Sequence, residues 1–124
     1  MGTGLKNLQV YQLSFELAMK IYEETSKFPK EEKYSLTDQI RRSSRSVCAN
    51  LAEAYRKRRY VSHFISKLSD ADMENTETQV WLQFSINCKY LSEERYDEFL
   101  DDSQRIGRMI DHMISNPEKF ARKW

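Results

Sequence analysis

The sequence has little glycine and little proline: three Gly and two Pro among 124 residues. Gly107 is the only glycine beyond the first four positions, and no proline lies between Pro29 and Pro117. Folds rich in β-strands need these residues at their turns, and loops that cradle phosphate groups need glycine. The scarcity therefore excludes a β-rich domain and a phosphate-binding glycine loop, and it leaves long stretches free to form helix.

Signals for secretion, disulfides and membranes are also missing. Cys48 and Cys88 lie forty positions apart with no CxxC pair, and the first residues lack the basic and apolar regions of a signal peptide. No apolar run approaches the roughly 20 residues that span a bilayer. We therefore expect a cytoplasmic protein with reduced thiols and no membrane partner.

Residues that carry enzyme chemistry do not occur at the required spacing. A di-iron site in a helical bundle needs Glu three positions before His, but Tyr60 precedes His63 and Met109 precedes His112 at that spacing. No HExxH motif is present, and no arrangement of nucleophile, His and carboxylate stands out. We expect no catalytic residues, no metal, no cofactor and no small-molecule substrate, so the protein is not expected to be an enzyme.

The hydrophobic pattern is helical along nearly the whole chain. Apolar residues recur at spacings of three and four, which marks one face of a helix. Such segments cover about 7–27, 36–56, 61–90 and 92–115. Because the connections are short, successive helices should be antiparallel neighbours. The sequence predicts an all-α fold in which a single domain, 1–124, forms an up-down-up-down four-helix bundle.

One face of each predicted helix is assigned to the core. In chain order, the assigned residues are Leu8, Tyr11, Phe15, Ala18 and Tyr22; Leu36, Ile40, Ser43, Val47, Leu51 and Ala54; Phe64, Leu68, Ala71, Asn75, Thr78, Leu82 and Ile86; and Phe99, Ser103, Ile106, Ile110 and Met113. Two of them, Asn75 and Thr78, stand out because buried polar groups need partners. We expect them to fix the register between helices.

Two predicted helices are also apolar on a second side, and a lone four-helix bundle cannot cover both faces of its helices. Small residues on the back of 36–56 would allow close approach of another helix. Together these features predict a homo-oligomer with an interface of Val10, Leu13, Leu17, Ile21, Ser46, Ala49, Met73, Val80, Trp81 and Phe84. Two alternatives stay open. The chain ends, with Phe120 and Trp124, could cover one patch, and the back of 36–56 could be a plain solvated face.

The net charge of +1 conceals two blocks of opposite sign. Residues 70–102 carry −8, and residues 41–59 carry +6. The basic residues of the second block are Arg41, Arg42, Arg45, Arg56, Lys57, Arg58 and Arg59. The last four fall at the turn between the second and third helices, flanked by Tyr55 and Tyr60. Arginine grips phosphate with forked hydrogen bonds and aromatic rings stack on exposed bases, so these residues are a candidate nucleic-acid site.

The same charges allow another interpretation. The basic turn could pair with acids of its own chain, or the two blocks could face each other between subunits of a heterologous ring. Near neutrality of the whole chain is unlike a dedicated nucleic-acid domain. Two hypotheses follow: a non-enzymatic homo-oligomer that binds RNA or DNA, and a protein-interaction scaffold with no nucleic-acid role.

The second predicted helix also carries a family likeness. Its distinctive positions are Leu36-Thr37, Gln39 to Arg42, Ser46-Val47, Asn50 and Ala52-Glu53, with Phe28-Pro29 before them and Glu77 to Gln79 after them. This pattern resembles the signature of the 23S rRNA-intervening-sequence protein family, over about 8–115. Ala54 stands where many members have Gly, and Ala71-Asp72 replaces a common Gly-Ser pair. The resemblance implies an antiparallel four-helix bundle that assembles into a homo-oligomer, with a pentamer as the suggested form, and it transfers no catalytic residues.

Overall fold

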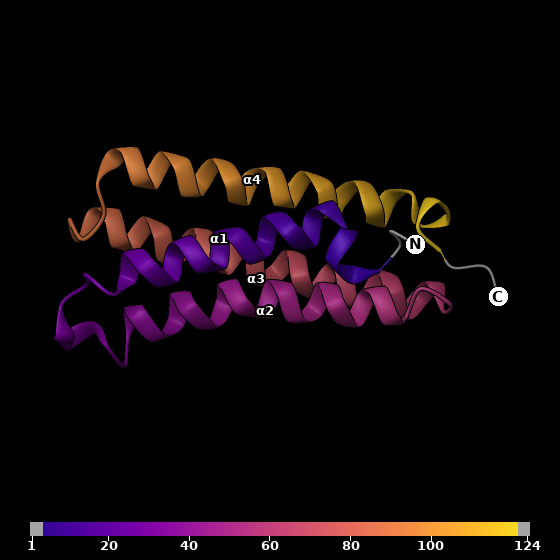
Figure 1. Cartoon of the computed structure of the whole chain (residues 1–124), viewed down its shortest axis with the longest axis horizontal. Helices are drawn as coiled ribbons and strands as arrows, with labels where there is room; N and C mark the ends of the chain where they lie inside the picture. Colours follow the sequence, from indigo (N-terminus) through magenta and orange to yellow (C-terminus); the bar gives the residue numbers. More distant parts are fainter. Residues whose placement is uncertain (1–3, 122–124) are drawn as a thin grey trace.

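The protein is an antiparallel bundle of four α-helices in a computed structural model that describes residues 4–121 (Figure 1). The helices are α1, Gln9–Thr25; α2, Leu36–Arg56; α3, Val61–Asn87; and α4, Glu93–Ser115. α1 packs against α2 and α4, and α3 packs against the same two helices, so α1 and α3 are diagonally opposed. The predicted fold class and topology are confirmed. Within the described residues, no helix is both long and apolar enough to cross a membrane.

Short 3-10 helices complete the connections. They are η1, Leu5–Asn7; η2, Lys30–Glu32; and η3, Pro117–Lys119. The carboxylate of Glu32 caps α2, since its Oε1 accepts hydrogen bonds from Leu36 N at 3.3 Å and from Ser35 Oγ at 2.6 Å. Its other oxygen accepts from Tyr90 Oη at 2.9 Å. The α1–α2 connection is thus fastened both to α2 and to the α3–α4 connection.

The helix bounds agree with the predicted ones to within a few residues. α2 coincides with the predicted 36–56, and α1 begins and ends two residues inside the predicted 7–27. α3 ends before residue 90 because Lys89 has a left-handed backbone with φ 64°, a conformation that commonly follows a helix end. α4 begins after Ser92, whose Oγ accepts a hydrogen bond from Arg95 N at 3.1 Å.

The predicted core faces of α2, α3 and α4 are confirmed, with Ile86 alone among them partly exposed. The polar members of these faces are paired. Asn75 Nδ2 donates to Ser103 O at 2.9 Å, and Ser103 Oγ donates to Asn75 Oδ1 at 2.8 Å. Thr78 Oγ1 donates to Ser43 Oγ at 2.8 Å. Because sliding one helix would leave these buried groups unpaired, the bonds hold α3 in register with α4 and α2.

The core face assigned to α1 is wrong at Phe15 and Tyr22, which are exposed, whereas Ala18 is buried and Leu8 and Tyr11 pack against the core. Part of the predicted interface is wrong as well. The aliphatic stripe that was expected to meet another subunit packs inside this chain and consists of Val10, Leu13, Leu17 and Ile21. Only Leu13 of these is partly exposed. The outer stripe of α1, which we call the α1 stripe, consists of Phe15, Met19 and Tyr22, which are 50%, 45% and 43% exposed.

Polar residues on the inner stripe of α1 explain the error. Ser14 and Thr25 lie between and after its aliphatic residues at helical spacing, and both are buried. Thr25 Oγ1 donates to Ile21 O at 2.7 Å, which satisfies its hydroxyl within the helix. These residues weaken the apolar signal of the true inner face. The aromatic residues of the opposite face strengthen the signal there, so spacing alone favours the wrong side.

Candidate nucleic-acid interface

The seven basic residues predicted to bind nucleic acid fall into two groups. Arg41, Arg42 and Arg45 lie in the first half of α2, whereas Arg56–Arg59 comprise its last residue and the turn into α3. Arg41 and Arg56 are fifteen residues apart, or about 22 Å at roughly 1.5 Å per residue. The structure therefore does not gather the seven side chains into one patch.

Arg41 is engaged in the fold. Its Nε donates to Thr25 Oγ1 at 2.8 Å, and its Nη2 donates to Tyr22 O at 3.2 Å. The guanidinium carbon also lies 4.6 Å from the centroid of the Tyr22 ring, whose face attracts a cation. Arg41 thus ties α2 to the end of α1, and two of its five N–H donors are used within the fold.

Arg42 and Arg45 lie on a groove of mixed charge between α2 and α3, with a volume of about 500 Å³. The remaining lining residues are Gln39, Ser43, Ser46, Ala49, Glu74 and Glu77. The pKa of Glu74 is raised, first by burial and then by the nearby carboxylates of Glu77 and Asp70. Acidic side chains in this position repel phosphate. The groove also contains the small residues Ser46 and Ala49 of the predicted interface.

The turn between α2 and α3 is placed differently, at one end of the bundle. Arg56 and Lys57 are exposed there, and Arg58 is partly exposed. Within residues 4–121, these three side chains make no ion pair. The preceding acid, Glu53, is held by Lys67 with Nζ 2.7 Å from Oε1. We call this end of the bundle, which carries the turn, the basic end.

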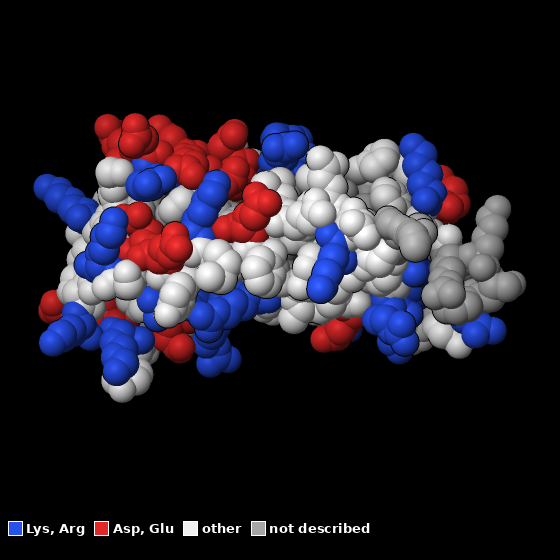
Figure 2. Space-filling view, viewed as in Figure 1, with Lys and Arg blue, Asp and Glu red and all other residues white. Residues whose placement is uncertain are grey.

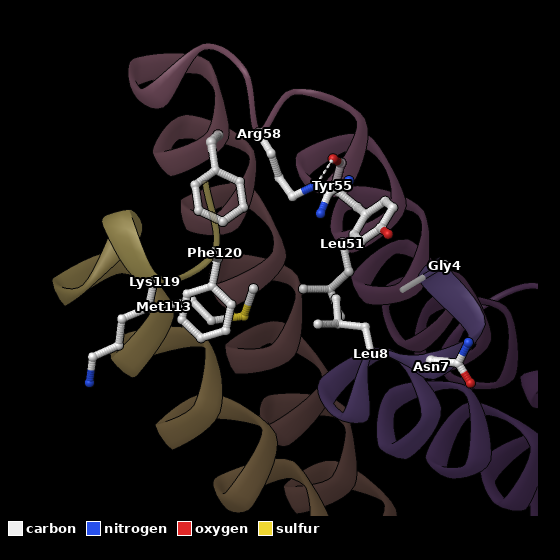
Figure 3. Close-up of a pocket in the computed structure, with 10 residues that line it drawn as sticks. Gly4, Asn7, Leu8, Leu51, Tyr55, Arg58, Met113, Lys119 and Phe120 are labelled. Atoms are coloured by element: carbon white, nitrogen blue, oxygen red, sulfur yellow. Dashed lines mark hydrogen bonds between the residues drawn. The ribbon is translucent and has the colours of Figure 1, made fainter. Parts of the chain in front are cut away.

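Arg58 is held against the ring of Tyr55 (Figure 3). Its Nε donates to Tyr55 O at 2.7 Å, and its guanidinium carbon lies 3.6 Å from the ring centroid. This bond uses one of the five N–H donors of the guanidinium, so its terminal nitrogens keep their donors. Tyr60 is exposed, and Arg59 lies 5.9 Å from its ring centroid. Such neighbouring cations and rings suit the phosphates and bases of nucleic acid.

The predicted interface residues of α3 are mostly at the surface. Met73, Val80 and Phe84 are exposed, whereas Trp81 packs partly against the core and donates from Nε1 to Glu77 Oε1 at 3.3 Å. The exposed residues belong to an uncharged stripe along the outside of the helix, the α3 stripe, which consists of Ser62, Ser66, Ser69, Met73, Thr76, Val80, Phe84 and Asn87. Because α1 and α3 are diagonally opposed, the α1 stripe and the α3 stripe face opposite sides of the bundle.

Further basic residues, which the sequence did not lead us to predict, border the basic end. Arg105 and Arg108 lie one turn apart on α4, and Lys119 lies in η3. Acidic side chains gather over the first half of α4, whereas basic ones are spread over the face and include a group along its lower edge near α2 (Figure 2). The signal was present in the sequence, since the charge along α4 changes sign after Asp102. The acidic block obscured it.

The histidines contact aromatic rings. The ring of His63 lies edge-on to Tyr60 with centroids 6.1 Å apart, and that of His112 lies edge-on to Phe120 at 6.0 Å. In the part of the chain that the structure describes, no group of three or more His, Cys, Asp and Glu side chains is arranged to hold a metal ion. Trp124, which the sequence offered as a cover for one apolar patch, lies outside the described residues.

Comparison with known proteins agrees with the helix pattern and the fold. The sequence profile of the 23S rRNA-intervening sequence protein family matches residues 6–112, which include α1, α2 and α3 and most of α4. The chain belongs to this family. The resemblance to this family that the α2 segment indicated is therefore confirmed.

A solved structure is similar to this member of the 23S rRNA-intervening sequence protein family. It is a protein with unknown function from the S23 ribosomal protein family, from Bacteroides thetaiotaomicron VPI-5482. The two sequences are 30% identical, and the structures superpose with a TM-score of 0.75 over 85% of this chain and 97% of the other. No curated protein sequence matches the chain.

Proposed function

We propose that this member of the 23S rRNA-intervening sequence protein family is a non-enzymatic homo-oligomer that binds nucleic acid, and RNA in particular, through its basic end. The observation that carries the proposal is the group of Arg56, Lys57 and Arg58, which have no ion-pair partner in residues 4–121 and belong to the same turn as the exposed Tyr60. Phosphate contacts supply most of the affinity of such sites. Arg41, by contrast, is already bonded within the fold.

Self-association through the sides of the bundle supports this role. The α1 stripe and the α3 stripe are uncharged and face opposite sides, and the centres of protein interfaces are depleted of charge. Contact between the α1 stripe of one copy and the α3 stripe of the next is heterologous, so it closes into a ring where the rotation permits. The family resemblance suggests five copies.

A ring of this kind leaves the ends of each bundle free. Cyclic symmetry places the same end of every copy on the same rim, so the basic ends gather there. Several weak sites on one rim raise the overall affinity by about 100-fold or more when one ligand reaches them together. A chain with a net charge of only +1 can then bind nucleic acid through a local concentration of arginine.

Charge reversal tests the basic end. The variant carries Arg56→Glu, Arg58→Glu and Arg59→Glu, and the matched control carries Lys27→Glu, Lys30→Glu and Lys33→Glu at the other end of the bundle. Fluorescence anisotropy with a labelled structured RNA at low salt should show at least about a 10-fold loss of affinity for the variant, because phosphate contacts are lost. The control has the same net charge and should keep its affinity. An unchanged affinity for the variant removes the basic end as the site.

A single substitution on each stripe tests the assembly. Phe15→Glu or Phe84→Glu places a charge in the proposed contact and should convert the oligomer to a monomer in size-exclusion chromatography with light scattering at micromolar concentration. Tyr34 is 85% exposed and lies outside both stripes, so Tyr34→Glu should leave the oligomer intact. A wild-type protein that is monomeric under these conditions contradicts the proposed assembly.

The placement of charge favours a second candidate, a scaffold with no nucleic-acid role. α2 carries most of the basic block, the first half of α4 is acidic, and these helices are the other diagonal pair of the bundle. A ring formed by contact of α2 with α4 of the next copy would bury both charged surfaces. Such a ring should dissociate at high salt and withstand Phe84→Glu, whereas a ring formed through the α1 and α3 stripes should do the reverse.

A further inference from the structure

Two adjoining pockets open at the basic end, and the function proposed above uses neither. The first, of about 210 Å³, lies between the α2–α3 turn and the segments near both chain ends (Figure 3). The second, of about 390 Å³, lies between the start of α1 and the second half of α4. Leu8, Met113 and Phe120 line both pockets, so these side chains form the wall between them.

The first pocket combines an apolar interior with a cationic edge. Leu51 and Phe120 line it from two sides in Figure 3, and the side chain of Tyr55 lies next to Leu51. Arg58 reaches its edge and is held there by the bond to Tyr55 O. Lys119 also lines the pocket, and its ammonium group points outward toward solvent. Positive charge thus lies at the mouth of the pocket.

The second pocket is built in a similar way. Val10 and Met109 contribute apolar walls, and Arg105, Arg108 and His112 lie along α4 beside them. The two arginines belong to the half of α4 that follows its acidic residues. The pocket therefore presents an apolar surface edged by positive charge, on the other side of the shared wall.

Both pockets differ from the groove between α2 and α3 in one respect. Neither has an Asp or Glu among the described residues that line it, whereas the groove has Glu74 and Glu77. Apolar walls, cations and the lack of a carboxylate favour a ligand with a flat apolar part and a negative charge. An unpaired nucleotide within a strand has both, because its base is flat and its phosphate is anionic.

We propose that the two pockets receive two successive unstacked bases of single-stranded nucleic acid, separated by the ring of Phe120. This inference rests on the proposed function and specifies the form of nucleic acid that is bound. A cavity of about 150 Å³ holds a benzene ring, so each pocket has room for the ring of a base. The flanking phosphates lie against Arg58 on one side and Arg108 on the other. Bases in a duplex are stacked and paired, and they cannot enter.

Binding of three polymers to the full chain tests the inference. The probes are a labelled ten-nucleotide oligouridine, an abasic RNA of the same length and charge, and a ten-base-pair RNA duplex, all measured by anisotropy at one low salt concentration. The oligouridine should bind at least about 10-fold more tightly than the abasic strand, because stacking adds this much for a single base. It should also bind more tightly than the duplex.

Substitution of the shared wall provides the matched test. Phe120→Ala should reduce the affinity for oligouridine to that for the abasic strand, and Phe120→Tyr should restore it. Tyr34→Ala removes an exposed ring far from the pockets and serves as the control. A second variant, Arg105→Gln with Arg108→Gln, changes only exposed side chains and should weaken binding of both strands. Circular dichroism verifies that each variant is folded.

The outcomes separate this inference from the proposed function. Equal affinity for oligouridine and the abasic strand, with no effect of Phe120→Ala, overturns the base pockets and leaves phosphate binding at the basic end in place. Failure of all three polymers to bind overturns the proposed function. The pockets are then judged by titration with uridine 5′-monophosphate, followed by amide NMR. Shifts confined to the lining residues support a nucleotide site, and their absence overturns it.

Discussion

The two ends of the bundle use charged side chains in different ways. At the basic end, Arg56, Lys57 and Arg58 make no ion pair within residues 4–121. At the opposite end, charged side chains from different helices bind one another. We call this the paired end, and it contains the connections 26–35 and 88–92. Lys20 and Arg95, near the paired end, therefore serve the fold, whereas Arg56, Lys57 and Arg58 remain available.

Ion pairs join α1 to α4 near the paired end. Lys20 Nζ lies 3.0 Å from both Glu98 Oε2 and Asp102 Oδ2. Arg95 Nη1 lies 2.7 Å from Glu98 Oε1, and its Nε lies 3.7 Å from Glu24 Oε1. The pKa of Lys20 is raised, first by its hydrogen bond to Glu98, which shows that the folded chain favours its charged form. These cations are already matched to carboxylates of their own chain.

The difference shows why a count of charges does not locate a binding site. A cation with a carboxylate on the neighbouring helix has given up its capacity to bind phosphate, and its removal affects stability. A cation without such a partner contributes little to stability, and its removal affects binding. Substitutions at the two ends should therefore have opposite consequences.

The largest expected difference between the ends is in the salt dependence of nucleic-acid binding. Replacing Arg56 and Lys57 by Gln should lower the slope of log affinity against log salt concentration by about 0.7 for each lost phosphate contact. The same double replacement of Lys30 and Lys33, outside the basic end, should leave the slope unchanged. Anisotropy titrations between about 50 and 200 mM salt measure both. Equal slopes for all three proteins would remove the distinction between the ends.

A smaller effect is expected on stability, and it should fall at the paired end. Lys20→Met removes a cation that bridges two carboxylates, and because its side chain is 41% exposed the loss should be about 0.5–1 kcal/mol. Lys57→Met, at the exposed basic end, should change the free energy of unfolding by less than about 0.5 kcal/mol. Urea denaturation measures both variants. A larger loss for Lys57→Met than for Lys20→Met would reverse the assignment of roles.

Acid should reduce the stability that the ionised carboxylate of Glu98 contributes near the paired end. Hydrogen bonds from Lys20 and then Arg95 lower the pKa of Glu98 below the ordinary 4.5. A lowered folded pKa means that the ionised carboxylate stabilises the fold above pH 4.5, and that this contribution is lost as the pH falls through the folded value. The difference in melting temperature between wild type and Glu98→Gln should therefore be greatest near neutrality and should shrink in acid.

The control for this pH dependence is the same pair of proteins in the Lys20→Met background. Without Lys20, the pKa of Glu98 should be lowered less. The difference in melting temperature at neutral pH between the protein with Glu98 and the Glu98→Gln variant should therefore be smaller in this background. Thermal melts followed by circular dichroism give all four values. If the wild-type difference stays constant from neutrality into acid, Glu98 does not carry the effect.

The smallest effect concerns the thiols. Burial raises the pKa of the Cys48 thiol to about 11, whereas Cys88 is exposed at the end of α3, within the paired end. Iodoacetamide near pH 8 should therefore modify Cys88 first, because the thiolate is the reactive form. Since the label is distant from the basic end, the affinity for RNA should not change. Mass spectrometry of the modified protein and an anisotropy titration verify the two parts, and faster labelling of Cys48 would contradict the first.

Most of the fold was predictable because every helix has a regular apolar face, and α2 and α4 have only one. α2 has one uninterrupted core stripe from Leu36 to Ala54, so its limits and its inner face were both predicted. α1 has apolar residues on two sides, and its inner stripe includes the polar residues Ser14 and Thr25. Periodicity identifies a helix in both cases. It does not indicate which of two apolar faces is turned inward, because the neighbouring helices decide that.

The candidate site was predictable only in part, for a related reason. The turn from Arg56 to Arg59 is a local feature, so its place between two helices followed from the chain order. The first pocket is lined by Leu8, Leu51 and Phe120, which are far apart in the sequence and meet only when the bundle is assembled. No spacing rule connects them. Their cationic edges were missed with them.

The sequence by itself determined that the chain forms four antiparallel helices, because apolar spacing and the scarcity of glycine and proline act locally along the chain. The tertiary structure decided which charged side chains are bonded within the fold. Arg41 and Arg56 lie on the same helix and have the same chemistry, but only Arg41 meets the hydroxyl of Thr25 and the carbonyl of Tyr22 on a neighbouring helix. Partners of this kind are supplied by packing between helices, so the available cations became visible only in the folded bundle.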